Sequence, residues 1–467
     1  MSNQKTTPRS TIETEDSRGQ KESEKPISRR SVLASGAAVG SVVFAGCSTD
    51  SDLTSETEDG VNNTASQNQE TDNDSGNVFS THPWPSIEGN AAQTRYLSTN
   101  SGPGPELEEV WSTTVESPAA NIGPIVTQNH VITADTSSKL YALDPMSGEI
   151  NWETSLETTP NQPLLANEST LVVQQDQRIV GRSLADGSMQ FDTTIDIPSE
   201  PASSGQDSSV NQTQLIAHNG TLFYGFNGKS NRYAIDITDG SQRWKTSDDW
   251  LVETDPSASN GMVIFPVAKN TNNISETGYI AHDATSGEQV WELSLEFQER
   301  PVVARSAVIT DDLIIARFTN RGEPVNWFAS IDLASGELLS VTFAGAGREF
   351  PNRIVATDGE DVFMHLAERL HGVIPLDNLT GNNTSFDSDA SRIYNGLTRI
   401  DQLRFDVLTD QYAYVRTGNS QFSIFDRGTN EIVSTQKSDW EISSAAVAGE
   451  FLFLGTGRGE VIGYGPS

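Results

Sequence analysis

Residues 140–152 read LYALDPMSGEINW. The first four are apolar or aromatic and suit a strand. Asp144 and Gly148 bracket a tight turn, because an Asp side chain can hydrogen-bond its own backbone and Gly accepts a positive φ. Trp152 follows on what we expect to be the outermost strand of a small sheet. The segment therefore predicts a β-hairpin followed by one large aromatic ring.

The same pattern recurs along the chain. Two copies are close, YAIDITDGSQRW at 233–244 and IAHDATSGEQVW at 280–291. The weaker copies lie at 183–191, 331–337, 376–381 and 425–431. From Gly148 to Asn430 the turn residue recurs every 47 residues on average, and Asn is the best substitute for Gly in the left-handed region. A period of this length is typical of four-stranded propeller blades, so we predict an all-β fold.

The repeat positions form the predicted structural framework. They are Trp111, Asp144, Gly148, Trp152, Gly187, Asp236, Gly240, Trp244, Asp283, Gly287, Trp291, Asp332, Gly336, Asp377, Gly381 and Asp426. Together they resemble the pyrroloquinoline-quinone (PQQ) repeat family, whose signature is Tyr-Ala-Leu-Asp-x-x-Thr-Gly-x-x-x-Trp. The resemblance covers roughly residues 82–467. The Trp becomes Phe191 in one copy and is lost at Ser340, Ser385 and Ser434, where packing must use other residues.

The two ends of the repeat region add one blade to the seven turns. Residues 110–113, VWST, suit an outer strand with no hairpin before it, whereas residues 450–464 supply inner strands without an outer one. Pairing of these ends would close the ring and leave no free sheet edge. We predict an eight-bladed β-propeller of four-stranded antiparallel blades over residues 81–467, closed by the N- and C-terminal strands. Seven blades are the alternative.

The segment before the repeats has the anatomy of an export signal. Residues 1–27 are polar and charged, and we expect them to be disordered. Arg29 and Arg30 precede a short apolar run rich in Gly and Ala. This arrangement resembles the twin-arginine signal, and the run is too short to span a bilayer.

The signal ends in Phe-Ala-Gly-Cys, which resembles a bacterial or archaeal lipobox. Small side chains at Ala45 and Gly46 would admit the peptidase, and Cys47 would take the lipid. Cys47 is also the only cysteine, so no intramolecular disulfide can form. We predict that residues 28–47 form a twin-arginine signal with a lipobox, and that lipid on Cys47 holds the protein at the extracytoplasmic face of the membrane.

Acidic residues dominate the composition. The 467 residues include 64 Asp and Glu against 30 Lys and Arg, a formal net charge of -34. Acidity spread along the chain excludes nucleic acid as a partner, because phosphates require clustered cations. High carboxylate content with few lysines resembles the proteins of salt-loving archaea. Residues 48–80 contain no Lys or Arg and predict an acidic, disordered tether between the anchor and the repeats.

Catalytic signals are weak. In the quinoprotein dehydrogenases of the PQQ family, the resemblance implies a quinone in the central channel over a Trp, beside a vicinal disulfide and a Ca²⁺ ion. One cysteine cannot form that disulfide, so we expect neither PQQ nor another cofactor. The six histidines lack metal-ligand spacing, and His282 suits a structural role better than a metal site. We interpret the acidic clusters 311–312 and 358–361 as solvated turns rather than Ca²⁺ loops.

The remaining candidates are surfaces. Trp250 and Trp440 each lie ten residues after a turn marker and are candidate contact residues in loops between blades. We expect a monomeric, non-catalytic scaffold that binds an unidentified protein partner and resembles the lipid-anchored propeller of outer-membrane assembly. The alternatives are a PQQ-dependent dehydrogenase and a receptor for a solute or polysaccharide.

Overall fold

A computed structural model gives the fold. The chain divides into residues 1–64 and 65–467, and every residue that the structure describes belongs to the second unit. The described residues are 86, 89–90, 92–97, 102–115, 123–160, 164–175, 178–195, 213–271, 274–296, 302–305, 307–320, 325–346, 354–367, 370–376, 392–393 and 404–466. Within these ranges no helix has the length and apolarity that a bilayer span needs.

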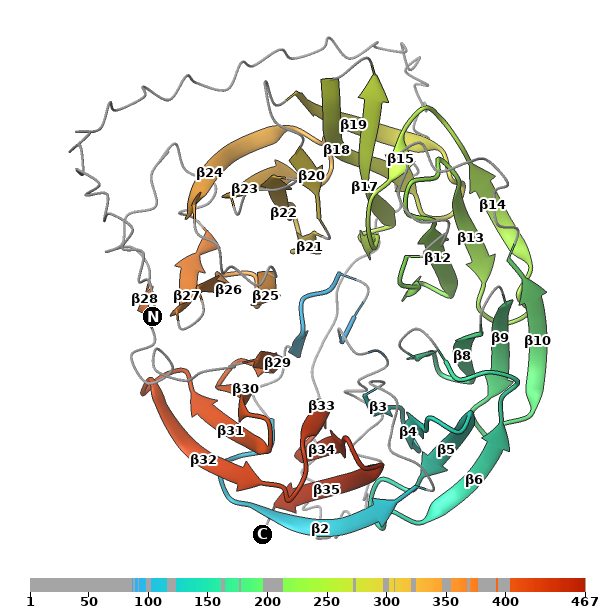
Figure 1. The fold of residues 1–467 in the computed structure, drawn as a ribbon, viewed down its shortest axis with the longest axis vertical. Helices are drawn as coiled ribbons and strands as arrows, with labels where there is room; N and C mark the ends of the chain where they lie inside the picture. Colours follow the sequence, from blue (N-terminus) through green and yellow to red (C-terminus); the bar gives the residue numbers. More distant parts are fainter. Residues whose placement is uncertain are drawn as a thin grey trace, which may run out of the picture. The chain divides into compact units, whose positions relative to one another are not determined.

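The described strands form eight sheets of four or five strands (Figure 1). Four of the sheets lie in the first half of the repeat region. They are β3 (Ile125–Val126), β4 (Val131–Ala134), β5 (Lys139–Leu143) and β6 (Ile150–Ser155); β7 (Leu165–Ala166), β8 (Thr170–Gln175), β9 (Arg178–Ser183) and β10 (Met189–Thr194); β11 (Ile216–His218), β12 (Thr221–Gly225), β13 (Arg232–Asp236) and β14 (Gln242–Thr246); and β15 (Leu251–Val252), β16 (Ser257–Ser259), β17 (Met262–Thr271), β18 (Ile274–Asp283) and β19 (Gln289–Glu296).

The other four sheets complete the set, and two of them include strands from the N-terminal side of the repeats. They are β20 (Val302–Ala304), β21 (Val308–Ile309), β22 (Leu313–Asn320), β23 (Val325–Asp332) and β24 (Leu338–Ala346); β25 (Ile354–Thr357), β26 (Asp361–Ala367), β27 (Leu370–Pro375) and β28 (Arg392–Ile393); β1 (Tyr96–Leu97), β29 (Arg404–Thr409), β30 (Tyr412–Gly418), β31 (Gln421–Asp426) and β32 (Glu431–Lys437); and β2 (Leu107–Thr114), β33 (Ile442–Ala448), β34 (Phe451–Thr456) and β35 (Glu460–Pro466).

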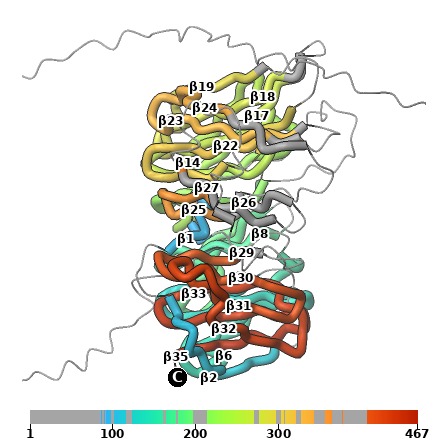
Figure 2. Tube along the Cα trace, turned by 90° about the vertical axis from the view of Figure 1, so that its left-hand side faces the viewer, coloured from blue at the N-terminus to red at the C-terminus, as the bar shows by residue number. Residues whose placement is uncertain are grey.

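Each sheet lies face to face with its neighbours around a common centre (Figures 1 and 2). The second strand of a sheet is therefore covered on both sides, and every residue of β8 and β34 is buried. The outer strand lies at the rim, and β6 alternates between exposed and half-buried residues. Apolar cores consequently lie between sheets, such as the one that joins Ala142 of β5 to Val173 of β8. The apolar run of an inner strand, which is buried on both faces, is why the repeat could be identified as strand sequence.

The first long strand and the last strand of the chain pair with each other. Strand β2 runs antiparallel to β35, with Trp111 opposite Gly463, and Figure 1 shows them side by side at the rim. The inner strand of the same sheet, β33, contacts both β3 and β29. Residues more than 300 positions apart in sequence therefore share one sheet. That sheet lies between the β3–β6 sheet and the sheet of β29–β32. The all-β expectation and the four-stranded antiparallel pattern are confirmed.

Every outer strand that the structure describes, apart from the two-residue β28, carries a β-bulge at the residue before the Trp position. The residues skipped in the register are Val110, Asn151, Gln190, Arg243, Val290, Leu339 and Val433. A bulge increases the local twist and interrupts the ladder, which makes an exposed edge a poor template for pairing with another chain. The sequence interpretation did not predict this feature, because no single residue type marks it.

Candidate functional site

A segment from the N-terminal side of the repeats crosses the centre around which the sheets are arranged (Figure 1). Its backbone carbonyls accept hydrogen bonds from inner strands of three different sheets. Ala92 accepts from Ile309 at 3.1 Å, Thr94 from Thr357 at 3.1 Å, and Arg95 from Leu408 at 2.8 Å. Residues 96–97 then pair in parallel with β29 as strand β1. We call residues 92–97 the central segment.

Two further contacts extend the reach of this region. The side-chain amide of Gln93 donates to the carbonyl of Pro256, just before β16, at 2.7 Å. Upstream, Ser86 forms an isolated antiparallel bridge with Leu165 of β7. Residues 86–97 therefore bond to five of the eight sheets. Because these bonds reach backbone groups in inner strands or directly before one, the region ties sheets together at the centre, where their own strands do not pair.

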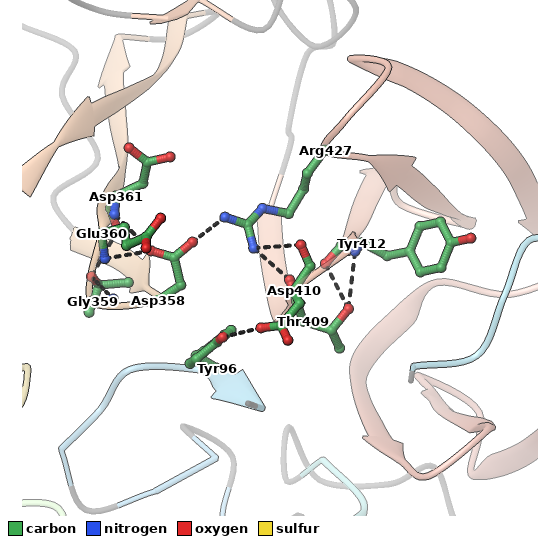
Figure 3. Close-up of polar contacts among 10 residues, drawn as sticks. Tyr96, Asp358, Gly359, Glu360, Asp361, Thr409, Asp410, Tyr412 and Arg427 are labelled. Atoms are coloured by element: carbon green, nitrogen blue, oxygen red, sulfur yellow. Dashed lines mark hydrogen bonds and ion pairs between the residues drawn. The ribbon is translucent and has the colours of Figure 1, made fainter. Parts of the chain in front are cut away.

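The central segment ends at a polar cluster in which strand β1 meets the turns β25–β26, β29–β30 and β31–β32 (Figure 3). The Tyr96 hydroxyl donates to Asp410, and burial together with this carboxylate raises the pKa of Tyr96. Arg427 donates to the carbonyls of Thr409 at 2.6 Å and Asp410 at 3.2 Å. The same guanidinium pairs with the carboxylate of Asp358.

The ion pair in this cluster is withdrawn from solvent. The side chains of Arg427 and Asp358 are 13% and 8% exposed, and the guanidinium carbon lies 5.2 Å from the centroid of the Phe363 ring. Asp358 also accepts from the backbone of Glu360 at 3.0 Å and of Asp361 at 2.7 Å. The expectation that 358–361 is a solvated turn is therefore wrong for Asp358. Its oxygens are engaged within the protein, which leaves a structural junction rather than a metal loop.

The predicted aromatic positions form contacts between sheets. Trp291 donates its indole N–H to Leu333 O at 2.9 Å in the next sheet. Three other indoles do the same, Trp111 to Pro145, Trp152 to Leu184 and Trp244 to Ala284. Each ring lies over the turn glycine of the neighbouring sheet, so that a Cβ at Gly336 would come within 2.5 Å of Trp291. Phe191 lies over Gly240 in the same way. The Trp of one repeat and the Gly of the next therefore form one interlocking pair.

The turn residues adopt the conformation that the hairpin requires. Gly148, Gly187, Gly240, Gly287, Gly336 and Asn430 all have φ between 61° and 76°. The motif aspartates bond within their own turns. Asp144, for example, accepts from the backbone of Met146 at 2.9 Å and of Ser147 at 2.8 Å. Hydrogen bonds from the same kind of neighbours lower the pKa of Asp283 and Asp332, and bonds from Thr238 and Arg243 lower that of Asp236 to about 2. These carboxylates stabilise their turns.

The loss of the Trp at Ser434 has a structural reason. The sheet next to β32 is the one that pairs β35 with β2, and the chain does not connect those two strands with a turn. There is consequently no turn glycine there for an indole to cover. Two framework positions, Asp377 and Gly381, lie outside the described residues, as do Arg29, Arg30, Ala45, Gly46 and Cys47.

The remaining candidates have distinct environments. His282 is 2% exposed, and its Nδ1 lies 3.0 Å from the carbonyl of Gly287, which is a structural role. Trp250 is only 4% exposed, so its interpretation as a displayed contact residue is wrong. Trp440 is 36% exposed and carries the Arg458 guanidinium 3.6 Å from its ring centroid.

The described residues do not fit the quinone and calcium site that the PQQ resemblance implies. No group of three or more His, Cys, Asp or Glu among them is placed to hold a metal. The motif aspartates are bonded in their turns, and the central segment crosses the region where the sheets converge. The four motif tryptophans lie on outer strands, which are at the rim of the sheets and not at the centre. We therefore derive no chemical step through a quinone.

The sequence matches the family described as outer membrane protein assembly factor BamB over residues 105–220 and 212–467. The chain belongs to the BamB family. The match spans all eight sheets and all seven turn markers. A comparison with curated proteins found no match.

Among solved structures, BamB from Moraxella catarrhalis is similar with a TM-score of 0.52 and 14% identity, covering 77% of this chain and 97% of that one. Quinohemoprotein alcohol dehydrogenase from Comamonas testosteroni has a TM-score of 0.54 and 12% identity, with coverage of 84% and 81%. A europium-containing methanol dehydrogenase has a TM-score of 0.57 and 11% identity, with coverage of 83% and 99%. At these identities the likeness shows the fold alone: this BamB-family chain is a β-propeller of PQQ-type repeats, as the sequence predicted. Both an assembly factor and enzymes share that fold.

Proposed function

We propose that this protein is a non-catalytic, protein-binding scaffold, held at the extracytoplasmic face of the membrane by lipid on Cys47. In this proposal each sheet is one blade, and the protein is a monomeric eight-bladed propeller that the β2–β35 pairing closes. Residues 28–47 direct export by the twin-arginine route, and residues 48–80 are the tether. No quinone, metal or nucleic acid takes part.

The central segment is the observation that carries the proposal. The PQQ resemblance places a quinone in the central channel of the catalytic members. In this chain, backbone bonds from Ala92, Thr94 and Arg95 to three inner strands occupy the centre. A ring whose centre is held by its own chain is suited to present its rim and loops to other proteins. Membership in a family described by outer membrane assembly supports the same mode of action.

Trp440 marks the surface that we assign to the partner. Its ring is partly exposed, lies between two sheets after β32, and is stacked by Arg458 from the β34–β35 turn. Aromatic residues and arginine are the side chains that most often dominate binding energy at protein interfaces. The pairing also holds the Trp ring in one orientation, which lowers the entropy lost on binding.

Chemical crosslinking in intact cells at high salt, followed by capture of the full-length protein from solubilised membranes, tests the proposal. We expect one or more specific proteins with the wild type and at least a tenfold lower yield with Trp440→Ala. Val290→Ala is the matched control, because Val290 is 49% exposed on an outer strand elsewhere. Equal capture by both variants would move the interface away from Trp440, and no specific capture by the wild type would overturn the scaffold.

The anchor and the enzymatic alternative have separate tests. Cys47→Ser should release the protein from the membrane fraction, and Arg29→Lys with Arg30→Lys should block export. Retention of Cys47→Ser on membranes would refute the anchor. Dye-linked alcohol oxidation after addition of PQQ and Ca²⁺ would favour the dehydrogenase. Thermal stabilisation by a sugar or another small solute would favour the receptor.

A further inference from the structure

Two interfaces between neighbouring sheets are built from equivalent parts but differ at the residue before the turn and at the residue opposite the outer-strand Thr, which is Leu140 in one and Arg232 in the other. In the interface between β6 and β9, Arg182 lies near the end of β9, one residue before Ser183, where the β9–β10 turn begins. Its guanidinium donates to the turn carbonyl of Gly187 at 2.9 Å and to the Thr154 hydroxyl at 3.1 Å. Thr154 lies two residues after Trp152 on the outer strand. Arg182 therefore bridges the outer strand of one sheet and the turn of the next.

In the interface between β14 and β18, His282 takes the place of Arg182. Both residues pair with the position two residues after the turn glycine, Arg182 with Met189 and His282 with Gln289. Thr246 takes the place of Thr154, because it lies two residues after Trp244. His282 keeps the contact with the turn, since its Nδ1 lies 3.0 Å from Gly287 O. The imidazole is shorter than an arginine side chain, and it forms no hydrogen bond to Thr246.

Three buried polar atoms are left without a hydrogen-bond partner in this interface. They are His282 Nε2, Thr246 Oγ1 and Arg232 Nε. Arg232 lies directly opposite Thr246 in the β13–β14 register and is fully buried. Its other guanidinium nitrogens are engaged, bonding to Asp248 at 2.8 and 3.1 Å and to Trp250 O at 3.2 Å. Burial of unpaired polar atoms is costly, so native proteins seldom leave several together.

The rings around His282 hold it in place. Its centroid lies 6.0 Å from that of Trp244 and 6.1 Å from that of Phe265, the latter edge to face. The guanidinium carbon of Arg232 lies 5.9 Å from the same Phe265 centroid. His282 and Arg232 therefore meet at one aromatic ring between the two sheets. Both side chains are buried there.

The three atoms have a defined hydrogen-bonding character. The carbonyl of Gly287 can only accept, so Nδ1 of His282 carries the hydrogen and Nε2 presents a lone pair. Burial, followed by the charge of Arg232, lowers the pKa of His282 to about 4, so the ring is neutral at pH 7. Arg232 Nε–H can only donate, and the Thr246 hydroxyl can do both. A metal cation would meet the guanidinium, and an anion would meet the imidazole lone pair, so both are disfavoured.

We propose that a single buried water molecule binds between Thr246, His282 and Arg232, where it takes the bridging role that the Arg182 guanidinium has in the equivalent interface. The water accepts from Arg232 Nε–H, donates to His282 Nε2 and bonds the Thr246 hydroxyl. Buried waters typically make about three hydrogen bonds to polar groups that otherwise lack partners. The water is an integral part of the contact between the β11–β14 and β15–β19 sheets.

A crystal structure of the full propeller at about 1.5 Å resolution tests the proposal directly. We expect one ordered water within hydrogen-bonding distance of all three atoms. Direct pairing of the three side chains with each other, or density for any other species, would overturn the proposal. So would a wild-type map without a water at this position.

Water relaxation dispersion in solution provides a second readout, because it counts long-lived internal waters. His282→Arg recreates the Arg182 arrangement, and we expect it to remove one such water relative to the wild type. Thr246→Val takes one partner from the water and should shorten its residence time at least severalfold without an added charge. His130→Gln, at a buried histidine in another sheet, is the control and should change neither quantity. An unchanged water count in folded His282→Arg, or unchanged exchange in Thr246→Val, would refute the site.

Discussion

Trp291 and Gly336 form a single contact between two sheets: the indole ring lies over a glycine whose φ is 72°, with no room for a Cβ. The same indole donates its N–H to Leu333 O, three residues before that glycine. The ring can pack here only because residue 336 is a glycine, since a Cβ at that position would displace the ring. The contact accounts for the turn Gly in each sheet that follows one of the motif aromatic residues, because that Gly receives the ring.

Gly336→Ala should lower the free energy of unfolding by about 2–4 kcal/mol, because it adds left-handed backbone strain and a clash with Trp291. Urea unfolding measures the change. Gly261→Ala is the matched control, since Gly261 has φ of 75° but nothing within 4 Å of an added Cβ. It should lose only the backbone part, about 1–2 kcal/mol. Equal losses in the two variants would show that the indole does not exclude the Cβ.

Trp244→Ala should cost about 3–5 kcal/mol, because it removes a buried aromatic ring and the bond to Ala284 between sheets. Calorimetry and urea unfolding report the loss. Trp440→Ala should cost well under half as much, since that ring is 36% exposed. A loss below about 1 kcal/mol for Trp244→Ala would contradict the role of the indole as an inter-sheet contact.

Arg427→Met should destabilise the protein by about 3–5 kcal/mol, because the Asp358 carboxylate would stay buried without its partner. Tyr96→Phe removes one hydroxyl at the edge of the same cluster and should cost about 1 kcal/mol. Thermal unfolding of the two single variants and of the double variant Asp358→Asn/Arg427→Met measures these losses of stability. The double variant should recover part of the loss, and no recovery would mean that the buried charge is not its cause.

Stability should fall as the pH drops from about 6.5 to about 4, in part through His282. Its pKa is about 4 in the folded protein and about 6.5 when unfolded, so protons bind the unfolded chain more readily across that window. The full contribution is about 3 kcal/mol and is present above pH 6.5. Urea unfolding of wild type and His282→Gln at several pH values isolates this residue from the carboxylates. Parallel pH profiles for the two proteins would show that His282 does not titrate in this way.

Low salt should destabilise the protein, because a net charge of -34 is screened only when the Debye length is short, about 3 Å at 1 M salt. We expect the melting temperature to rise steadily with KCl up to molar concentrations. Sucrose at matched osmolality is the control, since it adds no ions. A melting temperature that is independent of KCl would contradict an adaptation to high salt.

Much of the fold was predictable from local sequence. The turn in 140–152 needs Asp144 and Gly148 for reasons that lie within a few residues, so its copies mark the hairpins along the chain. Short, nearly continuous apolar runs identified the inner strands, because each inner strand is covered by sheets on both sides. The contact of Trp152 with the next sheet was also predictable, since a large flat ring on an outer strand can pack against the neighbouring sheet.

Other features depended on contacts between residues far apart in sequence. Nothing near Arg427 marks Asp358 as its partner, because the two meet only when neighbouring sheets bring their loops together. The two-residue strand β1 carries no periodic pattern, and its place at the centre depends on backbone acceptors that any sequence has. Trp250 and Trp440 have the same spacing from their turns, yet one is buried and the other exposed. Spacing alone cannot encode which neighbouring sheet covers a loop.

The sequence by itself determined the repeat, its hairpins and the recurring aromatic position, because these follow from short-range backbone geometry and the period of the strands. It also supports the prediction of a lipid anchor at Cys47, which stays a prediction. Only the tertiary structure decided that the central segment bonds to the inner strands, and that His282, Thr246 and Arg232 meet between two sheets. Those arrangements arise from the packing of whole sheets against one another, which sums many distant contacts that no local pattern records.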